Sequence, residues 1–173
     1  MREFDLSQLR ILVVDDNRHF IAIIRTVLRA FGVRRIFDCT DAVQALELLK
    51  QTEIDLALID LKIGDIDGLE LSRLIRSAPD SQNPRMPIIM ITAFSERSNV
   101  EAAISAGVDE FLVKPVSPQI LFKRIVWLIE HPRPYLRFGS YFGPDRRRQD
   151  SSKFSGKERR GDNLASPAER QPV

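Results

Sequence analysis

Residues 11–17 read Ile-Leu-Val-Val-Asp-Asp-Asn, an apolar run that ends on two carboxylates. Three further runs share this plan, and each ends on a carboxylate, a hydroxyl or an ammonium group. They are residues 56–59 before Asp60, residues 88–91 before Thr92, and residues 111–113 before Lys114. Short runs rich in Ile, Leu and Val are typical of strands that are buried on both faces of a parallel sheet. The four runs therefore predict four strands of one such sheet.

The polar residues that follow these runs are expected to meet in space. In an open parallel sheet, the ligand crevice lies beyond the carboxyl ends of the strands. Three carboxylates, one hydroxyl and one ammonium group would then converge on a single edge. That combination predicts a site that holds Mg²⁺, a phosphoryl group and a nucleophile together.

Strand and helix patterns alternate five times along the chain. Apolar residues at helical spacing run from Arg18 to Phe31, and residues 33–37 form the predicted second strand. Later helices are predicted to open at Asp41 with Gln44, at Asp67-Gly68, at Ser95 and at Ser117-Pro118. Alternation of this kind predicts an α/β fold, with a parallel sheet and right-handed crossovers.

In their order and spacing, these motifs resemble the receiver domain of two-component response regulators. The resemblance covers residues 8–131 and includes Gly68, eight residues after Asp60. It implies a flavodoxin-like, doubly wound sheet of five parallel strands in the order 2-1-3-4-5. The chain departs from the family at Ile63-Gly64, where Met-Pro is common, so the geometry of that loop is less certain to follow the family.

The resemblance also implies a phosphoacceptor and a metal site. Asp60 would accept a phosphoryl group from a phosphohistidine on a sensor histidine kinase or a histidine phosphotransfer protein. Mg²⁺ would be held by Asp15, Asp16, Asp60 and the backbone carbonyl of Lys62. A cluster of hard oxygen ligands suits this ion, because Mg²⁺ retains several waters and binds few carboxylates directly.

Further residues would respond to the phosphoryl group. By the same resemblance, Thr92 donates a hydroxyl hydrogen bond to it, Lys114 pairs with its charge, and Phe111 is the switch aromatic. The Lys114–Pro115 peptide bond is expected to be cis. Lys62 and Phe94 stand where the family sets the lifetime of the phosphoryl group, and both are bulky here.

Two enzyme classes are disfavoured by the same residues. A haloacid-dehalogenase-type phosphatase needs a second aspartate two residues after the nucleophile, where this chain has Lys62. A nucleotide-binding enzyme would need a Gly-rich phosphate loop, which the sequence lacks. We therefore expect a signalling protein that catalyses only its own phosphorylation and a slow autodephosphorylation.

Composition predicts a cytoplasmic protein that does not enter the membrane. No apolar stretch reaches the roughly 18 residues of a membrane span. The first residues, Met-Arg-Glu-Phe-Asp-Leu, lack an apolar signal region. The single cysteine, Cys39, has no partner for an internal disulfide.

Charge divides the chain at about residue 131. Residues 1–130 contain 16 Lys and Arg against 19 Asp and Glu, whereas residues 131–173 contain 10 against 5. Residues 132–173 are therefore predicted to be a basic, mostly disordered tail. Residues 141–147 and 154–160 both fit the pattern aromatic-x-Gly-x-acid-Arg-Arg.

The output of the protein is the least defined part of the sequence. We interpret the two tail units as a docking segment for a downstream protein, and binding of nucleic acid by the tail arginines is the alternative. The last predicted helix carries apolar residues beyond one face, which is a further candidate surface for the tail or for a homodimer. The kinase and the pathway cannot be identified from the sequence.

Overall fold

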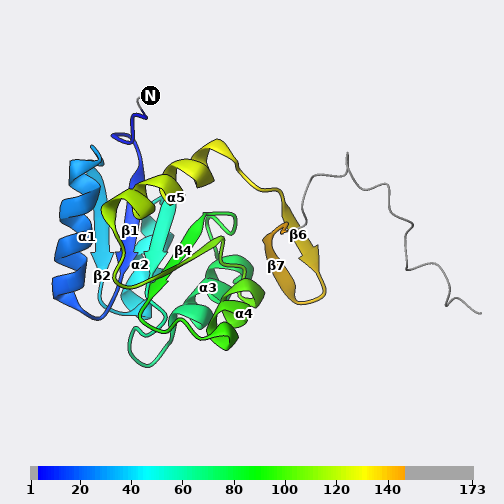
Figure 1. The fold of residues 1–173 in the computed structure, drawn as a ribbon. Helices are drawn as coiled ribbons and strands as arrows, with labels where there is room; N and C mark the ends of the chain where they lie inside the picture. Colours follow the sequence, from blue (N-terminus) through cyan, green and yellow to red (C-terminus); the bar gives the residue numbers. More distant parts are fainter. Residues whose placement is uncertain (1–3, 147–173) are drawn as a thin grey trace, which may run out of the picture.

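The computed structural model of the chain describes residues 4–146, and its main body is a five-stranded parallel sheet (Figure 1). The strands lie in the order β2-β1-β3-β4-β5, which confirms the predicted topology. Their bounds are β1 Arg10–Val14, β2 Arg35–Cys39, β3 Leu56–Ile59, β4 Ile88–Thr92 and β5 Glu110–Val113.

Five helices cover the two faces of this sheet. They are α1 Arg18–Ala30, α2 Ala42–Gln51, α3 Gly68–Ser77, α4 Arg97–Ser105 and α5 Pro118–Glu130. Successive strand residues point to opposite faces, so Ile11 and Val13 pack with α1 and α5, while Leu12 and Val14 pack with α2, α3 and α4. Burial on both faces explains why the strand sequences are continuously apolar.

Most helix starts lie where the sequence predicts them. Asp41 accepts a hydrogen bond from the Gln44 N–H at 2.8 Å, and Ser117 caps α5 with Pro118 at its first position. The prediction for Ser95 is wrong. The N-cap of α4 is Glu96, whose carbonyl accepts the first helical hydrogen bond, and its side chain makes no cap bond.

The second strand begins later than predicted. Val33 donates its N–H to the carbonyl of Leu28, so residue 33 still belongs to the turn that ends α1. Gly32, with a φ of +89°, makes this turn possible. The β2 strand then pairs with β1 from Arg35 opposite Arg10.

A β-hairpin that was not predicted from the sequence follows the five-stranded body. Strands β6 (Tyr135–Phe138) and β7 (Tyr141–Pro144) pair antiparallel around a Gly139-Ser140 turn. In Figure 1 the hairpin lies beside α3 and α4, after the chain leaves the end of α5. Residues 132–146 therefore differ from the disordered tail that was expected, and the second tail unit, at 154–160, lies outside the described residues.

None of the helices in residues 4–146 has the length and apolar character needed to cross a membrane.

Candidate functional site

Three carboxylates meet at the carboxyl edge of the sheet, as predicted. Asp15 and Asp16 follow β1, Asp60 follows β3, and one ligand oxygen from each lies within 4.8 Å of the others. Asp15 is buried, Asp60 is half-buried and Asp16 is exposed. The cluster is thus open to solvent on one side and enclosed on the other.

Backbone groups fix the direction of the two inner carboxylates. The Asn17 N–H donates to Asp15 Oδ1 at 2.9 Å, and the Leu61 N–H donates to Asp60 Oδ1 at 2.6 Å. Each carboxylate keeps its Oδ2 atom for the centre of the site.

Lys114 occupies that centre. Its Nζ donates to Asp15 Oδ2 at 2.6 Å and to Asp60 Oδ2 at 2.8 Å, and it lies 3.9 Å from the centre of the Phe20 ring. The Lys114–Pro115 peptide bond is cis, as expected. Phe20 was not predicted as a site residue, because its role depends on α1 and β5 meeting in space.

The charges of the site influence each other. Burial alone would lower the pKa of Lys114, but its hydrogen bonds to Asp15 and Asp60 outweigh burial and raise that pKa above its usual value. Burial raises the pKa of Asp15, although the hydrogen bond from Lys114 opposes the rise. The ammonium group therefore remains charged and offsets part of the negative charge around Asp60.

Thr92 and Phe111 lie on the two neighbouring strands. Thr92 is fully buried at the end of β4, and its Oγ1 accepts a hydrogen bond from the Phe94 N–H at 3.3 Å. Its carbonyl accepts a 2.8 Å bond from the Lys114 N–H, which joins the ends of β4 and β5. Phe111 is partly buried against the core on the α2–α3–α4 side.

Lys62 and Phe94 contact each other near the mouth of the site. The Lys62 Nζ lies 4.3 Å from the centre of the Phe94 ring, and 39% of Phe94 is exposed. A cation above an aromatic ring is attracted by the negative face of the ring. The pair links the loop after β3 to the loop after β4.

Gly68 allows the start of α3 to approach the Asp60 backbone. A Cβ atom at this position would lie 2.0 Å from the Asp60 carbonyl oxygen. The Gly68 N–H also donates to the Leu61 carbonyl at 2.7 Å. Any side chain here would displace the loop that positions Asp60.

The donor set fits Mg²⁺. Asp15, Asp16 and Asp60 supply carboxylate oxygens, which are the hard ligands that this ion prefers. Among the described residues, this is the one group of three or more acidic, His or Cys side chains with such convergence. The expected Lys62 carbonyl belongs to the adjacent loop, and its role as a ligand stays a prediction.

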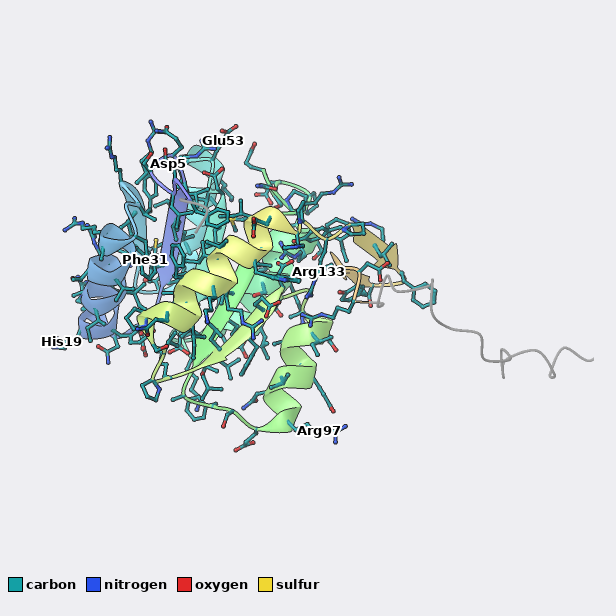
Figure 2. The ribbon with its side chains drawn as sticks, turned by 45° about the horizontal axis from the view of Figure 1, so that its top comes forward. Asp5, His19, Phe31, Glu53, Arg97 and Arg133 are labelled. Carbon is teal, nitrogen blue, oxygen red and sulfur yellow. The ribbon has the colours of Figure 1, made fainter. Side chains whose placement is uncertain are left out.

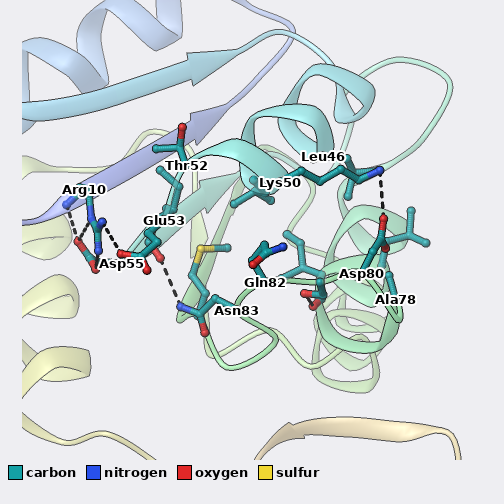
Figure 3. A pocket seen from close by; sticks show the side chains of 16 residues that line it. Arg10, Leu46, Lys50, Thr52, Glu53, Asp55, Ala78, Asp80, Gln82 and Asn83 are labelled. Carbon is teal, nitrogen blue, oxygen red and sulfur yellow. Dashed lines mark hydrogen bonds and ion pairs between the residues drawn. The ribbon is translucent and has the colours of Figure 1, made fainter.

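A separate pocket lies away from the three carboxylates. A pocket of about 310 Å³ lies between α2 and α3, and contains none of the predicted site residues (Figure 3). Its rim is closed by ion pairs, including Lys50 with Asp80 at 3.1 Å and Arg10 with Asp55 at 3.0 Å. Asp15, Asp16 and Asp60 lie at the other end of the strands.

Comparison with known protein families identifies the family of the chain. The model of the response regulator receiver domain matches residues 11–126. This chain belongs to that family. The match ends inside α5, so the β6–β7 hairpin lies beyond the part that the receiver family accounts for.

Curated relatives of the receiver domain include regulators of different length. The chain is 33% identical over 115 residues to the transcriptional regulatory protein YvrH of Bacillus subtilis, covering 66% of this chain and 46% of that protein. It is 30% identical over 122 residues to the chemotaxis protein CheY of Pseudomonas aeruginosa, covering 70% and 97%. The chain thus spans about half of YvrH and nearly all of CheY.

A solved receiver domain is similar in structure. The receiver domain of a sensor histidine kinase from Pseudomonas aeruginosa PAO1, with a magnesium ion coordinated in its active-site cleft, superposes with a TM-score of 0.60. It is 29% identical, and the match covers 69% of this chain and 94% of that one. The family places this chain in two-component signalling.

Proposed function

We propose that this chain is the phosphoacceptor of a two-component system, with Asp60 as the residue that is phosphorylated. The observation that carries the proposal is the Lys114 ammonium, which bridges Asp60 and Asp15 at the carboxyl edge of the sheet. A cation fixed between two carboxylates prepares the site for a third anionic group, the phosphoryl group.

Mg²⁺ is the proposed cofactor. Asp15, Asp16 and Asp60 would hold it, with the Lys62 carbonyl as a further ligand. When bound, the ion offsets the negative charge that an attacking carboxylate and a phosphoryl group bring together. The magnesium ion in the receiver domain of the Pseudomonas kinase supports this assignment.

The side chains then have separate roles in the transfer. Asp60 Oδ2 forms a bond to phosphorus, while the bond between phosphorus and the imidazole nitrogen of the donor breaks, and the imidazole leaves with the electron pair. Lys114 follows the new negative charge. The Thr92 hydroxyl donates a hydrogen bond to a phosphoryl oxygen.

The lifetime of the aspartyl phosphate would be set by Lys62 and Phe94. Hydrolysis requires a water molecule in line with the bond between phosphorus and Asp60 oxygen. Lys62 and Phe94 contact each other from the two loops that follow β3 and β4, where their bulk would cover part of this approach. We therefore propose a long-lived phosphoryl group and no turnover of other substrates.

Partners follow from this reaction class. The donor would be a histidine kinase or a histidine phosphotransfer protein, and the receptor of the signal a downstream protein. A homodimer through α5 is supported by two exposed apolar residues of this helix, Ile120 and Ile129. Part of the α5 surface is already covered, because Phe122 packs edge-on against Phe31 at 5.1 Å.

Nucleic-acid binding by the tail is not favoured by the described arginines. Arg146 donates to the carbonyls of Val108 and Asp109, and Arg133 pairs with Glu110 at 3.3 Å. Both guanidinium groups therefore face the body of the protein.

The proposal is tested by chemical phosphorylation. The full chain is incubated with acetyl phosphate and Mg²⁺, and its intact mass is measured before and after hydroxylamine, which cleaves acyl phosphates. We expect one added phosphoryl group on the wild type and none on Asp60→Asn, which is nearly isosteric. Equal labelling of both proteins would show that Asp60 is not the acceptor.

A further inference from the structure

A second ionic cluster lies at the opposite end of the sheet from Asp60. Asp109, just before β5, accepts hydrogen bonds from Arg76 Nη2 at 2.9 Å, the Ile88 N–H at 2.8 Å and the Tyr135 hydroxyl at 3.0 Å. We call these four residues the Asp109 clamp. It joins α3, β4, β5 and the hairpin through a single carboxylate.

Arg76 makes the clamp rigid. Its side chain is 2% exposed, and it donates through Nε to the Gly107 carbonyl and through Nη1 to the carbonyls of Pro84 and Met86. A guanidinium group offers five N–H donors in a fixed plane. With its partners on all sides, Arg76 cannot follow a shift of one strand without losing a bond to another.

The hairpin is seated on the same backbone segment. A Cβ atom at Gly143 would lie 2.8 Å from the Gly107 Cα, so β7 contacts the chain before β5 backbone to backbone. Arg146 donates to the Val108 carbonyl. Arg133, which lies just after α5 (Figure 2), donates to the Glu110 carboxylate of β5 at 3.3 Å. Docking of the hairpin therefore depends on the position of the backbone at the start of β5.

The two strands that leave the clamp are the two that end at the phosphorylation site. At the start of the strands, the Asp109 N–H donates to the Ile88 carbonyl at 2.9 Å. At their ends, the Lys114 N–H donates to the Thr92 carbonyl at 2.8 Å. β4 and β5 thus connect the Asp109 clamp directly to Thr92 and Lys114.

A phosphoryl group on Asp60 would act on the ends of both strands. Its negative charge attracts the Lys114 ammonium, and its oxygens accept a hydrogen bond from the Thr92 hydroxyl, which draws both side chains toward Asp60. Because the strands lie in a close-packed core, a displacement at one end is not absorbed locally. Every N–H group of Arg76 is already bonded. A shift of β4 relative to β5 would therefore break hydrogen bonds in the clamp.

We propose that the β6–β7 hairpin is a ligand that the chain carries in cis, docked by the Asp109 clamp when Asp60 is unmodified and docked more weakly when Asp60 is phosphorylated. This inference rests on the proposed function. The sign follows from the geometry: where Lys114 contacts Asp60 directly, the clamp is fully bonded, and any shift of β4 against β5 loosens it. Undocking frees the aromatic rings of Tyr135 and Phe142 for a partner.

Hydrogen exchange of the full chain tests the coupling. Peptides that cover 135–144 are compared with and without acetyl phosphate and Mg²⁺, and Asp60→Asn receives the same treatment. Exchange in the wild-type hairpin should rise about fivefold or more, a typical size for coupling between sites, and stay constant in Asp60→Asn. Labelled protein with unchanged hairpin exchange would overturn the coupling alone, whereas unlabelled protein would overturn the proposed function as well.

Linkage provides an independent test, because coupled binding equilibria influence each other equally. The probe is beryllium fluoride with Mg²⁺, a phosphoryl mimic that binds reversibly, followed by the fluorescence of the single Trp127, whose ring lies 4.7 Å from the Arg133 guanidinium. Tyr135→Phe removes the bonds of the Tyr135 hydroxyl to Asp109 and Arg76. The variant should both speed hairpin exchange and tighten binding of the probe, by a similar factor.

Tyr141→Phe is the matched control. Its hydroxyl donates to the Pro144 carbonyl within the hairpin at 3.1 Å and also interacts with Arg146, but it bonds to none of the four clamp residues. Probe affinity in this variant should equal that of the wild type. If Tyr135→Phe speeds hairpin exchange but leaves probe affinity unchanged, hairpin and site are independent.

Discussion

The two ionic clusters of this protein contain similar groups and differ in how completely they are bonded. At the carboxyl end of the sheet, Lys114 and Asp60 have side chains that are 18% and 11% exposed. At the amino end, the side chains of Arg76 and Asp109 are 2% and 3% exposed. The first cluster is still accessible from solvent, whereas the donors of Arg76 in the second are all bonded. An open ionic cluster indicates a reaction site, and a saturated one a structural joint.

Removal of the Asp109 carboxylate should have the largest effect on stability. Asp109→Ala leaves the buried Arg76 charge without its partner, and breaking such a pair costs about 3–5 kcal/mol of unfolding free energy. Denaturant titration measures the loss. Asp60→Ala is the comparison, and should cost far less, because it relieves repulsion among clustered carboxylates. Equal losses would mean that the two clusters do not differ as described.

Gly68→Ala tests how tightly the open cluster is positioned. The new Cβ would lie 2.0 Å from the Asp60 carbonyl oxygen, so either α3 or the Asp60 loop must move. Overpacking of this kind costs about 1–3 kcal/mol. We also expect slower labelling by acetyl phosphate at a protein concentration where the variant is folded. Gly64→Ala is the control for labelling, because its added Cβ meets no atom within 4 Å, although its φ of +88° carries a strain of its own.

Lys114→Met separates phosphorylation from its transmission. The three carboxylates remain, so labelling with Mg²⁺ should persist at a reduced rate. The cation that follows the phosphoryl charge is absent, so the phosphorylation-dependent rise in hairpin exchange should fall from about fivefold to near unity. If hydrogen exchange of the hairpin still rises as in the wild type, Lys114 does not couple the hairpin to Asp60, and Thr92 remains as the coupling residue.

The smallest expected effect is the pH dependence of the Lys114 bridge. Because the folded state raises the pKa of Lys114 above 10.5, its contribution to stability is complete below that pH and is lost as pH rises through the folded pKa. The difference in unfolding free energy between wild type and Lys114→Met should be about 1 kcal/mol near pH 9 and shrink above pH 10.5. A difference that grows with alkaline pH would contradict this sign.

The sequence was sufficient for the fold and for the meeting of three carboxylates at one edge of the sheet. The apolar runs predicted strands, and the rule that parallel strands end at one edge brought Asp15, Asp60 and Lys114 together before any coordinates were known. These inferences succeed because each depends on short segments and on a fixed topology. The Ser95 cap failed because two adjacent polar residues compete for the same position, and Glu96 occupies it.

The hairpin was missed for a different reason. A Gly-Ser pair between two aromatic runs is a recognised hairpin signal, but the charge and prolines after residue 130 favoured disorder. An isolated two-stranded hairpin is marginal in water. It is held here by Arg76 and Asp109, and the Tyr135 hydroxyl reaches Asp109 across 26 positions of sequence. No local pattern reveals a partner at that distance.

Because Cys39 is buried, a fluorescent dye can be attached selectively to a cysteine introduced elsewhere in the chain. Cys39, the sole cysteine, is 4% exposed, and burial, with smaller effects of Asp38 and Asp41, raises its pKa to about 11. Thiolate is the reactive form, so alkylating dyes at neutral pH should leave it untouched. Ser140→Cys at the exposed hairpin turn would then take a fluorophore at one position in an otherwise natural chain. Emission from that dye would follow each signalling event in real time.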